Sequence, residues 1–364
     1  MNKTLAALAV LGACTSNAFA QSNVTIYGII DAGITRVIND SGNGNNGTRT
    51  TIETGQMQTS RWGFRGEERL GGNLKARFGL EGLLHNDTGS AGIPTGTPSS
   101  TSLFDREATV GLSGDFGVVN IGRQNVLGMN VTTLADPMAM AFAPTNPNLL
   151  FTVKNSAPAF GAYGANNGGS ALRQSNSIRY TSPYYKNFGV ALMRAFGEQP
   201  GSTEKSKYEG VSGFYHTGPF SAATEYARMK NITAREELES YAFGARYTRK
   251  GFTLRSTYSA SKVEVTRRKI SVFGVGLDVP LAPALTLTSA VYNTRRSGDT
   301  SDDSQQGSVI AKYALSKRST AYASIGYART DSVVTASQIN LAQGFVSVGS
   351  DSAQRFTTGM LHVF

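Results

Sequence analysis

Residues 60–67 read Ser60-Arg61-Trp62-Gly63-Phe64-Arg65-Gly66-Glu67, with charged side chains at odd positions and aromatic side chains at even positions. Successive side chains of a β-strand point to opposite faces, so this segment predicts a strand with one charged face and one apolar face. Residues 74–81 repeat the alternation after a Gly71-Gly72 turn, which is typical of a β-hairpin. A soluble sandwich would bury the apolar face in a core. A membrane barrel turns that face to lipid and the charged face to a water-filled lumen.

Both ends of the chain favour the membrane barrel. The last segment ends on Phe364, and a final strand that closes on an aromatic residue is typical of outer-membrane barrels. Residues 1–20 carry Lys3, an apolar run over residues 5–13 and the small-residue site Ala18-Phe19-Ala20. This pattern predicts a signal peptide at residues 1–20 that is removed, leaving residues 21–364 as a single barrel domain. A second interpretation, in which Cys14 is acylated as in a lipoprotein, stays open.

Composition narrows the class further. Cys14 is the only cysteine, so the exported chain would have neither a disulfide framework nor a thiol nucleophile. After Gln21 no run approaches the ~20 consecutive apolar residues that a membrane-spanning helix needs. The net charge is +10, but no basic stripe with interleaved aromatic residues occurs, so no nucleic-acid partner is expected. These features indicate an all-β fold.

Short turns recur near residues 186, 218, 250, 282 and 317, with longer Asn-, Ser-, Asp- and Gly-rich stretches between them. Each interval accommodates two strands of about ten residues and one longer loop, the arrangement of an outer-membrane barrel. The expected fold is an antiparallel transmembrane β-barrel of sixteen strands. These are residues 24–34, 59–68, 73–84, 103–112, 117–123, 176–181, 188–196, 208–216, 220–229, 238–247, 252–260, 269–279, 285–293, 306–314, 320–329 and 353–364.

Several segments occur in order along the chain: Val24-Thr25-Ile26-Tyr27-Gly28, Leu70-Gly71-Gly72-Asn73, Phe104-Asp105-Arg106, Gly122-Arg123-Gln124 and Asn176-Ser177-Ile178-Arg179-Tyr180. Together they resemble the general porins of Gram-negative bacteria in their beta-proteobacterial form. The resemblance implies a homotrimer of sixteen-stranded barrels in the outer membrane, each with an aqueous pore that an inward-folded third loop narrows. It also implies contact with outer-membrane lipid and lipopolysaccharide, and passage of small hydrophilic solutes and inorganic anions. Leu361 and Val363 depart from the family, which often has polar or basic residues there.

The third loop is expected at residues 124–174, the longest connection in the chain. Unstructured loops of this length are uncommon in a compact domain unless they have a function. Residues such as Leu127, Met138 and Phe151 make it too apolar for a solvated surface loop, which favours packing on the inner wall. The alternative is that it covers the barrel mouth or contacts a neighbouring subunit. Its only acidic residue is Asp136.

The expected pore-lining residues combine strand parity with the family resemblance. By resemblance the wall arginines are Arg61, Arg106 and Arg173, and parity adds further charged side chains on the same wall. The full set is Arg61, Arg65, Lys75, Arg77, Glu81, Arg106, Asp136 and Arg173. One unit charge about 6 Å from an ion contributes roughly 0.7 to 3 kcal/mol, so a few arginines without partners predict an anion preference that salt weakens. The alternative is neutralisation by Glu67, Glu81 or Glu107.

Catalytic and metal-binding patterns are weak. Gly42-Asn43-Gly44-Asn45-Asn46-Gly47 satisfies a dinucleotide pattern but leads into no helix, so we interpret it as a first extracellular loop. His85, His216 and His362 have no metal-ligand spacing. We therefore expect no enzyme activity and no cofactor. A channel specific for one anionic nutrient, or a barrel that acts mainly as an adhesin or receptor, stays open as an alternative.

Overall fold

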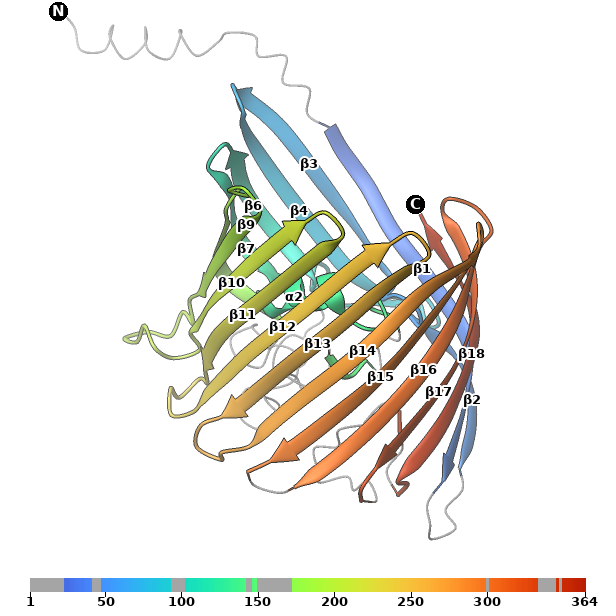
Figure 1. The fold of residues 1–364 in the computed structure, drawn as a ribbon. Helices are drawn as coiled ribbons and strands as arrows, with labels where there is room; N and C mark the ends of the chain where they lie inside the picture. Colours follow the sequence, from blue (N-terminus) through green and yellow to red (C-terminus); the bar gives the residue numbers. More distant parts are fainter. Residues whose placement is uncertain are drawn as a thin grey trace, which may run out of the picture.

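A computed structural model describes residues 23–40, 47–92, 102–141, 146–148, 172–298, 301–332, 345–346 and 349–364. The expected signal peptide at residues 1–20 lies outside them. The described chain forms one antiparallel sheet that closes on itself (Figure 1). Its strands are β1 Asn23–Asp40, β2 Thr48–Thr54, β3 Arg61–Gly71, β4 Leu74–His85, β5 Ser90–Ala91, β6 Glu107–Gly114, β7 Gly117–Asn125, β8 Arg173–Thr181, β9 Phe188–Ala195, β10 Tyr208–Thr217, β11 Phe220–Lys230, β12 Glu237–Arg249, β13 Phe252–Val263, β14 Lys269–Ala282, β15 Leu285–Ser297, β16 Asp302–Ala314, β17 Ser319–Thr330 and β18 Ser352–Val363.

The barrel wall has sixteen strands, as predicted, although the described residues form eighteen separate β segments. β2 and β3 both pair with β1, β3 along Asn23–Ile29 and β2 along Ala32–Ile38, so these two segments make up one strand of the wall. β5 has two residues and, within the described part of the chain, pairs with the end of β4. β1 and β18 close the ring from Ile29↔Val363 onward, and Gly28 and Phe364 exchange two backbone hydrogen bonds of 3.1 Å.

The outer wall is apolar and the inner wall is polar. Val24 and Ile26 on β1 are 61% and 62% exposed, whereas Asp31 and Thr35 on the opposite face are fully buried. A soluble protein would reverse this distribution, so the exposed band indicates a wall that faces lipid. In the described part of the chain, no helix has the length and apolar character required to cross a membrane.

Several observed strands extend beyond their expected ends, such as β1, which continues to Asp40, and β16, which begins at Asp302. Two further differences change the assignment itself. The fourth expected strand, residues 103–112, begins only at Glu107, because residues 103–106 form turns and bends. β2 was not expected, since its sequence Thr-Arg-Thr-Thr-Ile-Glu-Thr lacks an apolar alternation. The segment 55–60 between β2 and β3 folds inward, where the backbone amides of Met57 and Gln58 each donate to Asp31 Oδ2 at 2.6 Å. Gly42–Gly47 lies mostly outside the described residues.

Part of the expected third loop lies inside the barrel. Helix α2, Gly128–Ala135, contacts β11, β12 and β13, and Figure 1 shows it within the ring of strands. Val131 packs on Ala223 and Ala242, which are buried on the inner faces of β11 and β12. Gly244 permits this approach, because a Cβ there would lie 2.8 Å from the Cβ of Ala135. Residues 142–145 and 149–171 are outside the described part, so the inward course of the whole loop stays a prediction.

Candidate pore-lining site

Two arginines share one carboxylate on the inner wall. Arg61 opens β3, and its Nε lies 3.5 Å from Glu81 Oε2 on β4. Arg106 Nε lies 2.5 Å from Glu81 Oε1. The hydroxyl of Tyr27 also donates to Glu81 Oε2, at 3.1 Å. One negative charge therefore serves two guanidinium groups, which leaves a positive excess at this point of the wall.

Arg106 reaches this site because it precedes its strand. In regular β6 geometry it would share the outward parity of Ala108 and Val110, and Val110 is 60% exposed on the outer wall. Residues 103–106 instead form turns, and the Arg106 amide donates to the carbonyl of Glu81 at 3.1 Å. That backbone bond brings the guanidinium to the inner side. The parity argument consequently does not apply to this residue.

Arg123 and Arg173 add two more guanidinium groups. Arg123 Nε donates to the carbonyl of Asp105 at 2.5 Å, and Arg123 Nη1 donates to Ser175 Oγ at 2.8 Å. Arg173, only 7% exposed, lies within electrostatic range of Arg106, Arg123, Asp105 and Glu81. The cluster thus holds four guanidinium groups near the carboxylates of Glu81 and Asp105, and Glu107 lies opposite Glu81 on the neighbouring strand. We call these six residues, Arg61, Glu81, Asp105, Arg106, Arg123 and Arg173, the arginine cluster.

Strand parity alone could not have found Arg123. Ile121 on the same strand is exposed on the outer wall, and regular alternation would point Arg123 outward too. The β7–β8 register shifts between Gly122 and Gln124, and Gly122 has φ +126°. A bulge with a glycine at a positive φ redirects the next side chain, so the signal in the sequence was Gly122 itself.

Arg65, Lys75 and Arg77 lie nearer the short-turn rim than the arginine cluster. The Arg65 guanidinium lies 5.0 Å from the ring centre of Tyr27. Lys75 Nζ is 3.0 Å from Glu67 Oε2, and both side chains are exposed. With Arg69 and Arg77 they line a hollow of about 430 Å³. The structure therefore places these expected residues in a separate basic group on the same wall.

Asp136 is placed differently from the other expected residues, since it is 1% exposed and faces protein. It follows α2 as its C-cap residue. Its carboxylate accepts five hydrogen bonds: from the amides of Met138 at 3.1 Å and Met140 at 2.8 Å, from Asn146 Nδ2 at 3.0 Å, from Asn148 Nδ2 at 2.8 Å and from the hydroxyl of Tyr292 at 3.2 Å. Burial raises the pKa of Asp136, and these donors oppose that rise. The arrangement fastens the loop to β15.

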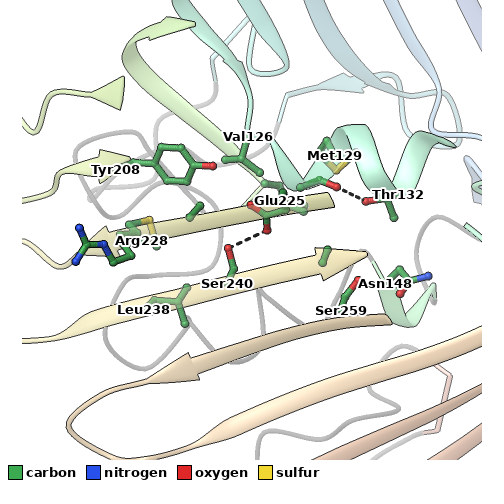
Figure 2. A pocket seen from close by; sticks show the side chains of 15 residues that line it. Val126, Met129, Thr132, Asn148, Tyr208, Glu225, Arg228, Leu238, Ser240 and Ser259 are labelled. Carbon is green, nitrogen blue, oxygen red and sulfur yellow. Dashed lines mark hydrogen bonds between the residues drawn. The ribbon is translucent and has the colours of Figure 1, made fainter. Parts of the chain in front are cut away.

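A small cavity of about 30 Å³ separates the start of α2 from the wall. Figure 2 shows Glu225 at its centre, with a hydrogen bond from Ser240 Oγ to Glu225 Oε1 of 3.1 Å. Glu225 Oε2 is buried and has no hydrogen-bond partner among the described residues. A Cβ at Gly128 would lie 3.0 Å from Glu225 Oε1, so the carboxyl group lies against the N-terminus of the helix.

No set of three or more histidine, cysteine, aspartate or glutamate side chains in the described ranges could hold a metal ion. Buried polar side chains of the barrel are mainly hydroxyl and amide groups, and arginines outnumber carboxylates only within the arginine cluster. Such a wall offers hydrogen bonds and positive charge to a passing solute.

The family model described as Gram-negative porin matches residues 6–332. The chain belongs to the Gram-negative porin family. This porin is 36% identical over 255 residues to outer membrane porin protein 32 of Delftia acidovorans, with 67% of each chain covered. It is 26% identical over 378 residues to the major outer membrane protein P.IB of Neisseria lactamica, covering 95% of this chain and 100% of that one.

Solved structures agree with the fold of this porin. An anion-selective porin from Comamonas acidovorans superposes with a TM-score of 0.78 at 26% identity, covering 94% of this chain and 100% of that chain. OmpT of Vibrio cholerae, in a trimer form, has a TM-score of 0.65 at 15% identity over 94% and 99% of the two chains, which shows a common fold. The porin is therefore an outer-membrane channel protein and not an enzyme.

Proposed function

We propose that this porin forms a water-filled channel for passive diffusion of small hydrophilic solutes and ions, with a preference for anions. The observation that carries the proposal is the sharing of Glu81 between Arg61 and Arg106. Among the described residues, Glu107 contacts Thr109 and Glu67 contacts Lys75, so neither forms an ion pair with these two arginines. The alternative of full neutralisation is therefore less well supported.

The position of the loop supports the same proposal. Met138 and Ala141 pack with Tyr292, Tyr322 and Leu361 in an apolar cluster on the inner side of the barrel. α2 covers the inner faces of β11 to β13. In the ring order β11 to β13 lie across from β3 and β4, so α2 narrows the lumen on the side away from Arg61 and Glu81. Positive charge beside a narrow aqueous path raises the local concentration of anions.

The proposed assembly is a homotrimer in contact with outer-membrane lipid and lipopolysaccharide. The exposed apolar outer wall supports the lipid contact. The trimer form of OmpT supports the trimer by analogy of fold. Light scattering of the detergent-solubilised protein, corrected for bound detergent, measures the assembly directly. A mass of one chain would contradict the trimer and leave the channel proposal intact.

The channel proposal is tested by the reversal potential across a KCl gradient in planar bilayers. Wild-type protein should give a chloride-directed potential that weakens at high salt. The double variant Arg61→Glu/Arg106→Glu should lose that preference, because it reverses two charges of the arginine cluster. The control Lys317→Glu/Arg318→Glu changes the same number of charges at a solvated turn and should retain it. A cation-directed wild-type current would overturn the anion preference, and absence of current would overturn the channel.

A further inference from the structure

The outer wall is hollowed across β14 to β17. Two adjoining hollows of about 660 and 630 Å³ share Val291, Gly307 and Tyr327. Gly307 pairs with Val291 on one side and with Tyr327 on the other. Val291 is 64% exposed, whereas Gly307 contributes no side chain, and a Cβ built there meets nothing within 4 Å. The result is a notch between two large outward side chains, which we call the outer-wall groove.

The two ends of the outer-wall groove differ in chemistry. Towards the short-turn rim it is lined by apolar side chains, including Leu277 and Ile325. Towards the long-loop rim it is lined by Asn293, Gln305 and Arg329, which form one cross-strand row. An apolar groove that ends at a row of polar side chains matches a membrane lipid, which has an apolar acyl chain and a polar headgroup.

Arg329 provides a positive charge at the polar end. Its Nε donates to Gln305 Oε1 at 3.1 Å, which holds the side chain across the row. In the described ranges, no carboxylate lies within 4 Å of this guanidinium, although other outward arginines such as Arg295 have one. An exposed arginine next to the headgroup region attracts anionic headgroups, and phosphate suits the guanidinium geometry.

We propose that the outer-wall groove binds one acyl chain of an anionic, phosphate-bearing membrane lipid, with Arg329 at the phosphate. The acyl chain of the lipid fills the notch at Gly307, which the neighbouring side chains leave open. The inference rests on the proposed function only in that this wall faces the membrane. It assigns a lipid site to one defined position of the outer wall.

Native mass spectrometry of delipidated protein in detergent tests the site. The probes are phosphatidylglycerol, phosphatidylcholine with the same acyl chains, and inorganic phosphate. Wild-type barrels should each bind one phosphatidylglycerol more tightly than phosphatidylcholine. Gly307→Phe should remove that binding, since it fills the notch at a position with free space. Arg329→Gln should weaken phosphatidylglycerol by about 2- to 5-fold, the range of one exposed ion pair, and weaken phosphatidylcholine less, because the choline cation offsets the charge of its phosphate.

The control Ala222→Phe places the same ring on β11, away from the groove, and should bind lipid as wild type does. Channel conductance of Gly307→Phe should remain normal, which separates this inference from the channel proposal. Unchanged lipid binding by Gly307→Phe would overturn the site. Equal binding of the two lipids, or competition by inorganic phosphate, would overturn the anionic-lipid assignment. Dissociation of Gly307→Phe into single chains would mean that a second copy occupies the groove.

Discussion

Replacing Glu81 by glutamine should strengthen the preference for anions, because it removes the carboxylate that Arg61 and Arg106 share. One charge about 6 Å from a permeating ion contributes about 0.7 kcal/mol in bulk-like water. That energy changes the local population of an ion by about threefold. The local population of anions rises by this factor and that of cations falls by it, so the ratio of chloride to potassium permeability should rise by about tenfold at low salt.

The assay is the reversal potential in planar bilayers at two mean salt concentrations. At about 1 M salt the Debye length is about 3 Å, and the difference between Glu81→Gln and wild type should shrink markedly. Glu67→Gln is the matched control, because its partner Lys75 lies near the short-turn rim and both side chains are exposed. A reversal potential equal to wild type at low salt, or one shifted towards potassium, would refute the argument that Glu81 limits the field of the arginine cluster.

Gly244→Ala should displace α2, since the new Cβ would lie 2.8 Å from that of Ala135, and the single-channel conductance should therefore change. The control Gly213→Ala should conduct as wild type does, because its Cβ would have no neighbour nearer than 3.6 Å. Tyr292→Phe removes one hydrogen-bond donor from buried Asp136 and should weaken the attachment of the third loop to β15 by about 1 kcal/mol. The loop should then be cleaved faster by a protease, and an unchanged cleavage rate would argue against this attachment. Lys230 and Lys207 lower the pKa of Glu204 to about 2, so its ion pairs should persist below the ordinary glutamate pKa and be lost only as pH falls towards 2; a carboxyl NMR titration with a midpoint above 4 would contradict this.

The barrel could be predicted from the sequence because lipid and water impose opposite demands on alternate residues. β9 and β11 alternate between more exposed and buried residues along their length, and the expected ends of β9 to β11 lie within one residue of the observed ones. β2 escaped prediction because its threonine-rich sequence carries no apolar stripe. Pairing with β1 makes this segment a strand, although its own sequence pattern does not predict one.

The arginine cluster was predictable only in part. Arg61 and Glu81 lie on regular strands, so parity places both on the inner wall. Arg106 and Arg123 depend on a turn and a bulge, and a shift of one residue reverses the face of a side chain. Asp136 shows another limit, because charge alone suggests a pore-lining group while its five donors hold it buried where the third loop attaches to β15. The role of the cluster at the pore stays a prediction until currents are measured.

The seam between Gly28 and Phe364 also constrains how the molecule assembles. Its partners are separated by almost the whole chain, whereas the hairpins along the wall close after a few residues. Compared with a ten-residue loop, joining ends this far apart costs about 3 kcal/mol of additional chain entropy. We therefore expect the hairpins to form first and the seam to close last. Until then β1 and β18 are unpaired edges, and this open sheet is the species most exposed to edge-to-edge aggregation.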